Sequence, residues 1–170
     1  AKLMDLFVTG KAKAWAEPAP DHAVHAPKLQ ELETTCPDLP DSSLNAVIER
    51  MNAIKRVEGI EEKTLRQYQS FSALFTMLTG ISDITKIRQP DVKAFRADLS
   101  KMPKSWGKSP KDQADTRDAV MAKSAALPSD KVGLSVGTVN RHLEHLNQIA
   151  EWARDEGLPV DPNLKPSKLR

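Results

Sequence analysis

The longest uninterrupted amphipathic run in the chain spans residues 136–156 and stops at Gly157. At 100° per residue its apolar positions fall on one arc, which predicts a helix with one buried face. Glycine is the residue type best suited to the left-handed cap that ends a helix. The positions expected to be buried are Val136, Val139, Leu143, Leu146, Ala150 and Ala153.

Other segments repeat this pattern. Residues 44–57 follow the cap cluster Asp41-Ser42-Ser43 and stop before Gly59, and residues 61–78 stop before Gly80. A third helix is expected to open at Pro90. The stripe expected to be buried in the first of these helices is Leu44, Val47, Ile48, Met51 and Ile54. No Asn-Gly or Asp-Gly hairpin signal occurs between alternating apolar runs, so we expect an all-α protein, a compact bundle of four to five helices.

Prolines and polar runs divide the chain. Five prolines between residues 18 and 40 exclude a long helix there, so residues 1–41 are interpreted as a linker with a short helix over about 2–15. Residues 42–164 are expected to form the helical domain. Within it, residues 102–134 are interpreted as an insertion with a marginal helix over 110–125. Residues 165–170 are expected to begin a linker toward a further domain, since both ends look cut from something longer.

Charge is concentrated in one region. Residues 86–117 carry nine basic and four acidic side chains, a net +5 within a chain whose formal charge is +2. Such a stretch fits a surface for a polyanion, and it equally fits a solvated lysine-rich loop. The single cysteine and the lack of an apolar run of about 20 residues predict a soluble, intracellular protein without a membrane partner.

Two predicted helices have an outer arc rich in hydrogen-bond donors. In the last helix this arc comprises Thr138, Arg141, His145 and Gln148. In the second helix it comprises Lys63, Arg66, Gln67 and Ser70. Side chains of these types contact phosphates and base edges in DNA, although an ordinary solvated face has the same composition.

Three segments carry a family resemblance: Gly59–Tyr68, with Lys-Thr-Leu-Arg-Gln-Tyr; Ile84–Phe95; and Leu134–Gly157, with Leu-Ser, Thr-x-Asn and Trp-Ala before glycine. Their order and spacing resemble the SAM-like core-binding domain of phage-type integrases, which are tyrosine recombinases. The resemblance covers residues 42–164, and the long stretch 102–134 departs from small members of the family.

The resemblance implies a helical clamp on one face of a recombination half-site, in which the second and fourth helices face the DNA. The residues at matched positions are Lys63, Thr64, Arg66, Gln67 and Ser70 in the second helix, and Ser135, Thr138, Arg141, His142 and His145 in the fourth. Of the two histidines, His145 is expected to contact DNA and His142 to pack in the interior. The lysines Lys104, Lys108, Lys111 and Lys131 are further candidates for phosphate contacts. Expected partners are an attachment or core site in duplex DNA and other integrase protomers.

Catalysis is not expected from this chain. The family cleaves DNA with an Arg, a Lys, a His-x-x-Arg pair and a nucleophilic Tyr, yet no histidine here is followed three residues later by arginine. The one tyrosine, Tyr68, lies in an apolar stripe, and no metal-ligand spacing or phosphate loop occurs, so no cofactor is expected. The resemblance implies a cytoplasmic, nucleoid-associated protein of bacterial or phage origin. A helical protein-interaction module and a helix-turn-helix transcription factor are the alternatives.

Overall fold

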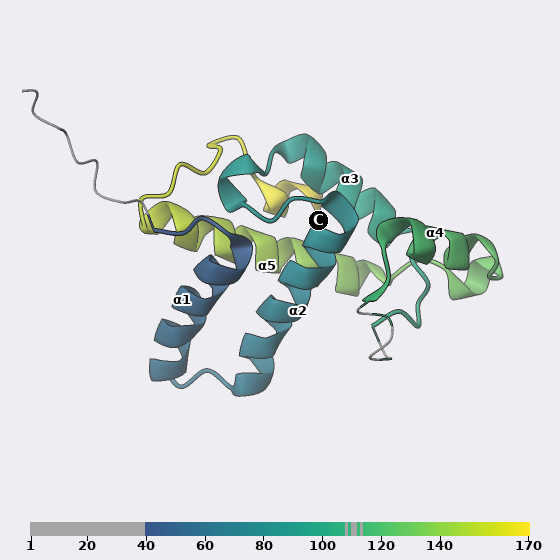
Figure 1. Cartoon of the computed structure of the whole chain (residues 1–170), viewed down its shortest axis with the longest axis horizontal. Helices are drawn as coiled ribbons and strands as arrows, with labels where there is room; N and C mark the ends of the chain where they lie inside the picture. Colours follow the sequence, from purple (N-terminus) through teal and green to yellow (C-terminus); the bar gives the residue numbers. More distant parts are fainter. Residues whose placement is uncertain (1–39, 108, 110–111, 113) are drawn as a thin grey trace, which may run out of the picture. The chain divides into compact units, whose positions relative to one another are not determined.

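The structure is a computed structural model that describes residues 40–170, apart from 108, 110, 111 and 113. The helix expected over 2–15 lies outside the described residues. The described part is helical, as expected, and has the form of an all-α bundle (Figure 1). Its α-helices are α1 (Leu44–Val57), α2 (Glu62–Thr79), α3 (Gln89–Leu99), α4 (Arg117–Ala125) and α5 (Val136–Asp155). Short 3-10 helices are η1 (Ile84–Lys86), η3 (Ser129–Lys131) and η4 (Pro166–Leu169).

Local signals account for the helix ends. The hydroxyl of Ser43 accepts from the Ala46 amide at 3.3 Å, and that of Ser135 accepts from the Thr138 amide at 3.2 Å. These contacts satisfy amides that a helix leaves unpaired in its first turn. Gly80 ends α2 with φ 72°, a left-handed conformation that glycine adopts without steric cost. The observed bounds of α1, α2 and α5 and the start of α3 lie within one residue of the predicted ones.

An aromatic cluster forms the centre of the core. Phe71 and Phe75 of α2 meet Phe95 of α3, with ring centroids 6.1 and 4.9 Å apart. All three rings are fully buried. Aliphatic side chains of α1 and α5 close around them, and Figure 1 shows α5 running across the α1–α2 hairpin. Burial of this apolar surface is the main force that holds the helices together.

Two positions expected in the core are exposed instead. Ile54 is 48% exposed and Val136 is 75% exposed. Ile54 lies in the last turn of α1, near the free end of the α1–α2 hairpin (Figure 1). Val136 is the first residue of α5, and burial in that helix begins at Val139. Helical spacing places a residue on an arc, but only the neighbouring helices decide how far along the arc the burial extends.

The insertion forms a loop closed at its neck. Pro103 and Val132 pair in an isolated antiparallel bridge, and the Gly133 amide donates to the Met102 carbonyl at 2.8 Å. Gly133 has φ 84°, and a Cβ there would lie 3.0 Å from the Ser100 carbonyl oxygen. The helix inside the loop is shorter than expected over 110–125, because α4 begins at Arg117 behind the N-cap Thr116.

The chain after α5 packs back onto the domain. Leu164 and Pro166 are buried, and the Arg154 guanidinium donates to the carbonyls of Asp161 and Leu164 at 3.1 and 2.8 Å. Residues 166–169, expected to belong to a linker, form η4 against α5 and α3. In the described residues no helix combines the length and the apolar character that crossing a bilayer requires.

Candidate nucleic-acid interface

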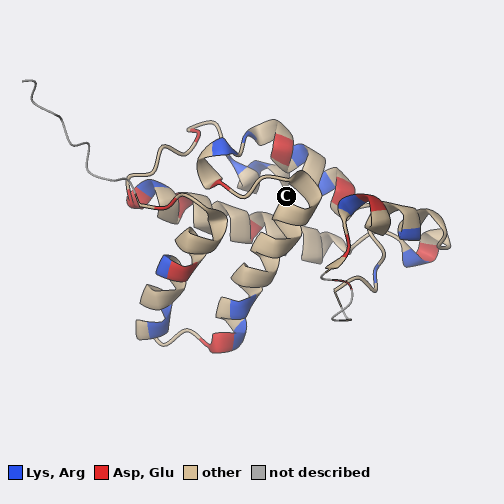
Figure 2. Cartoon of the chain, in the orientation of Figure 1, with Lys and Arg blue, Asp and Glu red and all other residues tan. Residues whose placement is uncertain are grey.

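The outer side of α2 carries most of the side chains expected to contact DNA. Lys63, Arg66 and Ser70 are exposed, and the Arg66 side chain is 74% exposed. Thr64 and Gln67 lie at the edge of this side and are half-buried. Figure 2 shows basic positions at the free end of the α1–α2 hairpin. The exposed side of α2 therefore presents cations and a hydroxyl to solvent.

The acidic side chain of Glu62 lies near this surface and has cationic partners, whereas Glu58 and Glu61 at the same end of the hairpin are exposed and form no ion pair with a described residue. Glu62 forms an ion pair with Arg56, whose Nη2 atom lies 3.2 Å from the Glu62 carboxylate. Nε of Arg66 lies 4.0 Å from the same carboxylate. Lys63 forms no ion pair with any described residue. Exposed pairs of this kind contribute little to stability, so Arg66 can exchange Glu62 for a phosphate at small cost.

Arg141 is the exposed cation on α5. It forms no ion pair in the part of the chain that the structure describes. Arg141 precedes Gln148 by seven residues, about two turns, so both lie on the same flank of α5. The hydroxyl of Tyr68 donates to Oε1 of Gln148, which ties that flank to α2. Arg141 therefore lies on the side of α5 that borders α2.

Sequence patterns did not indicate two polar contacts of this region. Nζ of Lys55 lies 5.6 Å from the centroid of the Tyr68 ring, a cation–π contact. Gln148 accepts from Tyr68 and donates through Nε2 to Glu144 at 3.0 Å, so this residue of the donor-rich arc is occupied within the fold. Glu144 also pairs with Arg170.

Ser135 and Thr138 stand at the start of α5. The Ser135 hydroxyl caps the helix and lies 2.9 Å from the Thr138 hydroxyl. Ser135 is exposed and Thr138 is half-buried. Helix capping alone is enough to explain why a serine and a threonine occur at these two positions. The free amides of a helix N-terminus also attract anions, which keeps the pair compatible with a phosphate contact.

The expectation that His145 contacts DNA is wrong. It is only 7% exposed, and its ring centroid lies 4.9 Å from that of Tyr68 and 6.0 Å from that of Phe71. Burial, together with the charge of Arg141, lowers the pKa of His145, so the ring is neutral near pH 7. Because the ring is buried among aromatic side chains and carries no positive charge, His145 is a packing residue. The crossing of α2 over this turn of α5 covers it.

His142 packs in the interior, as expected. Its ring stacks on Phe71 at a centroid distance of 6.1 Å and meets Phe95 edge-on at 6.4 Å. Burial lowers the pKa of His142 to about 4, and the charges of His145 and Arg141 act in the same direction. Its Nδ1 atom, like that of His145, is buried without a hydrogen-bond partner among the described residues. Both imidazoles are thus held neutral at the α2–α5 contact.

The four lysines of the insertion that were expected to contact phosphates divide into three groups. Nζ of Lys104 donates to the Asp130 carbonyl at 2.8 Å, which gives this exposed side chain a role in closing the neck. Lys131 is exposed, and its carbonyl accepts from the Lys104 amide. Lys108 and Lys111 lie outside the described residues.

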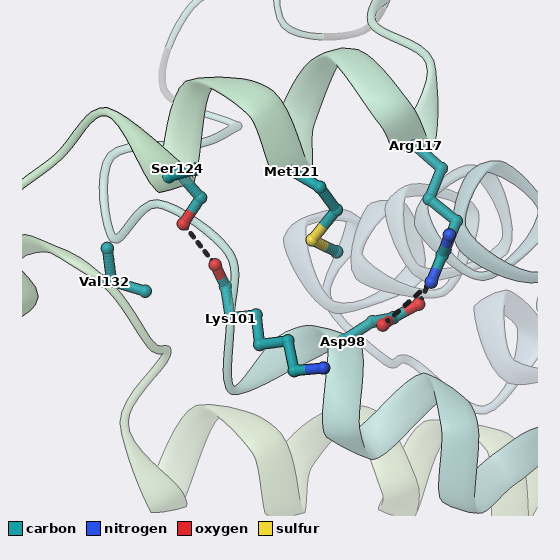
Figure 3. Close-up of a pocket in the computed structure, with 7 residues that line it drawn as sticks. Asp98, Lys101, Arg117, Met121, Ser124 and Val132 are labelled. Carbon is teal, nitrogen blue, oxygen red and sulfur yellow. Dashed lines mark hydrogen bonds and ion pairs between the residues drawn. The ribbon is translucent and has the colours of Figure 1, made fainter.

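A cavity of about 470 Å³ separates α4 from the end of α3 (Figure 3). Across it, Nε of Arg117 lies 2.8 Å from the carboxylate of Asp98, and the Ser124 hydroxyl donates to the Lys101 carbonyl. Asp98 neutralises Arg117, so these contacts anchor α4, and Lys101 is the remaining cation that lines the cavity and forms no ion pair with a described residue. No group of three or more metal-ligating side chains occurs among the residues that the structure describes.

Comparisons of the chain with protein-family models, with curated proteins and with solved structures found no match.

Proposed function

We propose that this chain is a DNA-binding domain that grips duplex DNA through α2 and the adjoining flank of α5, as the core-binding domain of a phage-type integrase does. The observation that carries the proposal is the placement of Lys63, Arg66 and Arg141. All three are exposed on two helices that the Tyr68–Gln148 hydrogen bond joins directly. Phosphate contacts from such side chains supply most of the affinity of non-specific DNA binding.

The resemblance supplies the finer part of the proposal. The bound site is a core or attachment half-site, and further protomers assemble on the same DNA during integration and recombination. DNA cleavage and rejoining belong to a catalytic domain beyond this chain, which itself lacks the family's His-x-x-Arg pair. A protein with this role acts at the nucleoid of a bacterial cell.

A direct experiment is fluorescence anisotropy of a labelled 30-base-pair duplex of arbitrary sequence, titrated with the whole chain at low salt. Arg66→Ala and Arg141→Ala are each expected to weaken binding by about 3- to 10-fold, because each removes one phosphate contact. Neither substitution should change the melting temperature by more than a few degrees, since both side chains are exposed.

Lys123→Ala is the matched control, because Lys123 is an exposed cation of α4 that pairs with Asp115 at 2.6 Å. It should bind duplex DNA as the wild type does. Equal losses for Lys123→Ala and Arg141→Ala would mean that net charge alone drives binding, and the assignment of the interface to α2 and α5 would be wrong.

A second candidate, a protein-interaction module, has one observation in its favour. Val57 is 87% exposed, and Ile54 and Ile60 beside it at the α1–α2 turn are 48% and 40% exposed. Exposed apolar clusters often mark protein contacts. This candidate predicts that Val57→Ser abolishes capture of a protein partner, whereas the DNA-binding proposal predicts unchanged duplex affinity for that variant.

A further inference from the structure

Four exposed cations on α3 and at η4 are distinct from the residues assigned to duplex binding. Lys93 and Arg96 belong to α3, Lys168 belongs to η4, and Lys165 directly precedes η4. We name these four residues the α3–η4 cluster. No member of the cluster forms an ion pair within the described part of the chain.

Backbone geometry brings the four side chains together. Gln89, Lys93 and Arg96 are spaced four and three residues apart, so they share one side of α3. The Gln89 side chain donates to the Lys165 carbonyl at 3.1 Å and accepts from the Lys165 amide at 2.9 Å. Lys168 follows Lys165 by one turn of η4, and its amide donates to the Lys165 carbonyl at 3.2 Å. Through its two hydrogen bonds to Lys165, Gln89 holds the cations of α3 beside those of the η4 segment.

The acidic residues of the same segments are occupied. Asp91 accepts from the Arg88 amide at 2.8 Å, Asp98 pairs with Arg117 at 2.8 Å, and Asp161 lies 3.7 Å from the Arg88 guanidinium. The side chains of Asp98 and Asp161 are only 11% and 15% exposed. The charge that this surface presents to solvent is therefore positive.

The residue types on the surface of α3 and η4 indicate which class of partner it can bind. None of the exposed large hydrophobic residues of the described chain lies on α3 or η4. A protein interface needs a desolvated apolar or aromatic centre, and a membrane-surface helix needs apolar side chains to insert. A phosphodiester backbone needs only cations at its surface. The α3–η4 cluster therefore fits a nucleic-acid backbone.

Lys93 of the cluster and Arg66 of α2 point in opposite directions. Phe75 of α2 and Phe95 of α3 touch, with centroids 4.9 Å apart. Arg66 precedes Phe75 by nine residues, so it points about 180° away from this contact, and Lys93 precedes Phe95 by two residues, so it points about 160° away. Figure 2 accordingly shows basic positions on α3 and, apart from them, at the free end of the α1–α2 hairpin.

We propose that the α3–η4 cluster binds the backbone of a second duplex, so that this domain bridges two DNA segments. The inference rests on the proposed function, because the first duplex is held by α2 and α5. Arg66 and Lys93 point away from the α2–α3 contact in opposite directions, so one straight duplex cannot contact both. Each surface contributes its own phosphate contacts and therefore its own salt dependence.

A bridging assay tests this with the whole chain. One 30-base-pair duplex is immobilised, the protein is added, and capture of a second, labelled duplex is measured over a range of salt concentrations. Lys93→Gln/Lys168→Gln is compared with Lys86→Gln/Lys123→Gln, which has the same net charge and alters exposed cations outside both surfaces. Anisotropy with a single duplex is measured in parallel.

The wild type and the control should capture the second duplex. The cluster variant should capture less of it, with a salt slope lower by about 1.8, or 0.9 for each lost phosphate contact, while the single-duplex anisotropy reports retained binding. Single-duplex binding by the wild type without bridging would overturn the α3–η4 proposal and leave the proposed function standing. Loss of single-duplex binding in the cluster variant, but not in Arg66→Ala, would instead overturn the assignment to α2 and α5.

Discussion

Replacing His142 by phenylalanine should make the domain less sensitive to acid. The imidazole stacks on Phe71 at 6.1 Å and lies 6.3 Å from the ring of His145, with its Nδ1 atom buried and unpartnered. A proton on this ring would be held among aromatic side chains near the positive charge of Arg141. Phenylalanine preserves the aromatic contact and cannot take up the proton.

The magnitude follows from the shift in pKa. Burial lowers the pKa of His142 from 6.5 to about 4, so between these values the unfolded chain binds a proton that the folded chain does not. The free energy of unfolding therefore falls as the pH falls, by about 1.4 kcal/mol per pH unit within this window. From pH 7 to pH 4.5 the free energy of unfolding therefore falls by at most about 2 kcal/mol, since solvent still reaches part of the ring.

Urea unfolding followed by circular dichroism at pH 7 and at pH 4.5 measures the effect. His142→Phe should resemble the wild type at pH 7 to within about 1 kcal/mol, since the substitution changes the volume little. At pH 4.5 it should be more stable than the wild type by about 1 to 2 kcal/mol. Equal losses of stability in the two proteins between these pH values would refute the burial of a neutral His142.

Three further substitutions test the packing. Leu143→Ala should lower the free energy of unfolding by about 2 to 5 kcal/mol in urea titrations, because Leu143 is fully buried. Tyr68→Phe should cost about 1 kcal/mol in the same assay, because Gln148 loses its donor; no change would mean that the hydrogen bond is absent in solution. Glu156→Gln should destabilise the domain at pH 7, because the hydrogen bond from Arg50 stabilises the ionised carboxylate and lowers the pKa of Glu156. This contribution to stability is lost only as the pH falls through the lowered pKa. This difference between wild type and variant should disappear in strong acid.

The helices could be predicted from the sequence because their signals are local. Periodic apolar positions, the caps Ser43 and Ser135 and the stop at Gly80 are encoded within a turn or two of each helix end. The exposed cations Arg66 and Arg141 were also predicted, since each lies well away from its helix's apolar arc. Whether these cations bind DNA stays a prediction.

The errors arise where another helix decides the outcome. His145 lies on the polar arc of α5 by spacing, yet α2 crosses it and widens the buried side, a non-local effect that a helical wheel does not contain. The helix expected over 110–125 begins later than its local signals predict, because the observed N-cap of α4 is Thr116. The cluster of Lys165 and Lys168 with α3 depends on Gln89, which pairs with a segment 76 residues away.

The salt dependence of duplex binding tests the central claim most directly. The logarithm of the association constant is measured against the logarithm of the salt concentration for the wild type and for Lys63→Ala/Arg66→Ala/Arg141→Ala. Three cations in contact with phosphates predict a slope that is shallower by about 2.7 in the triple variant. Identical slopes for the two proteins, or wild-type affinity that does not change with salt, would contradict a DNA interface on α2 and α5.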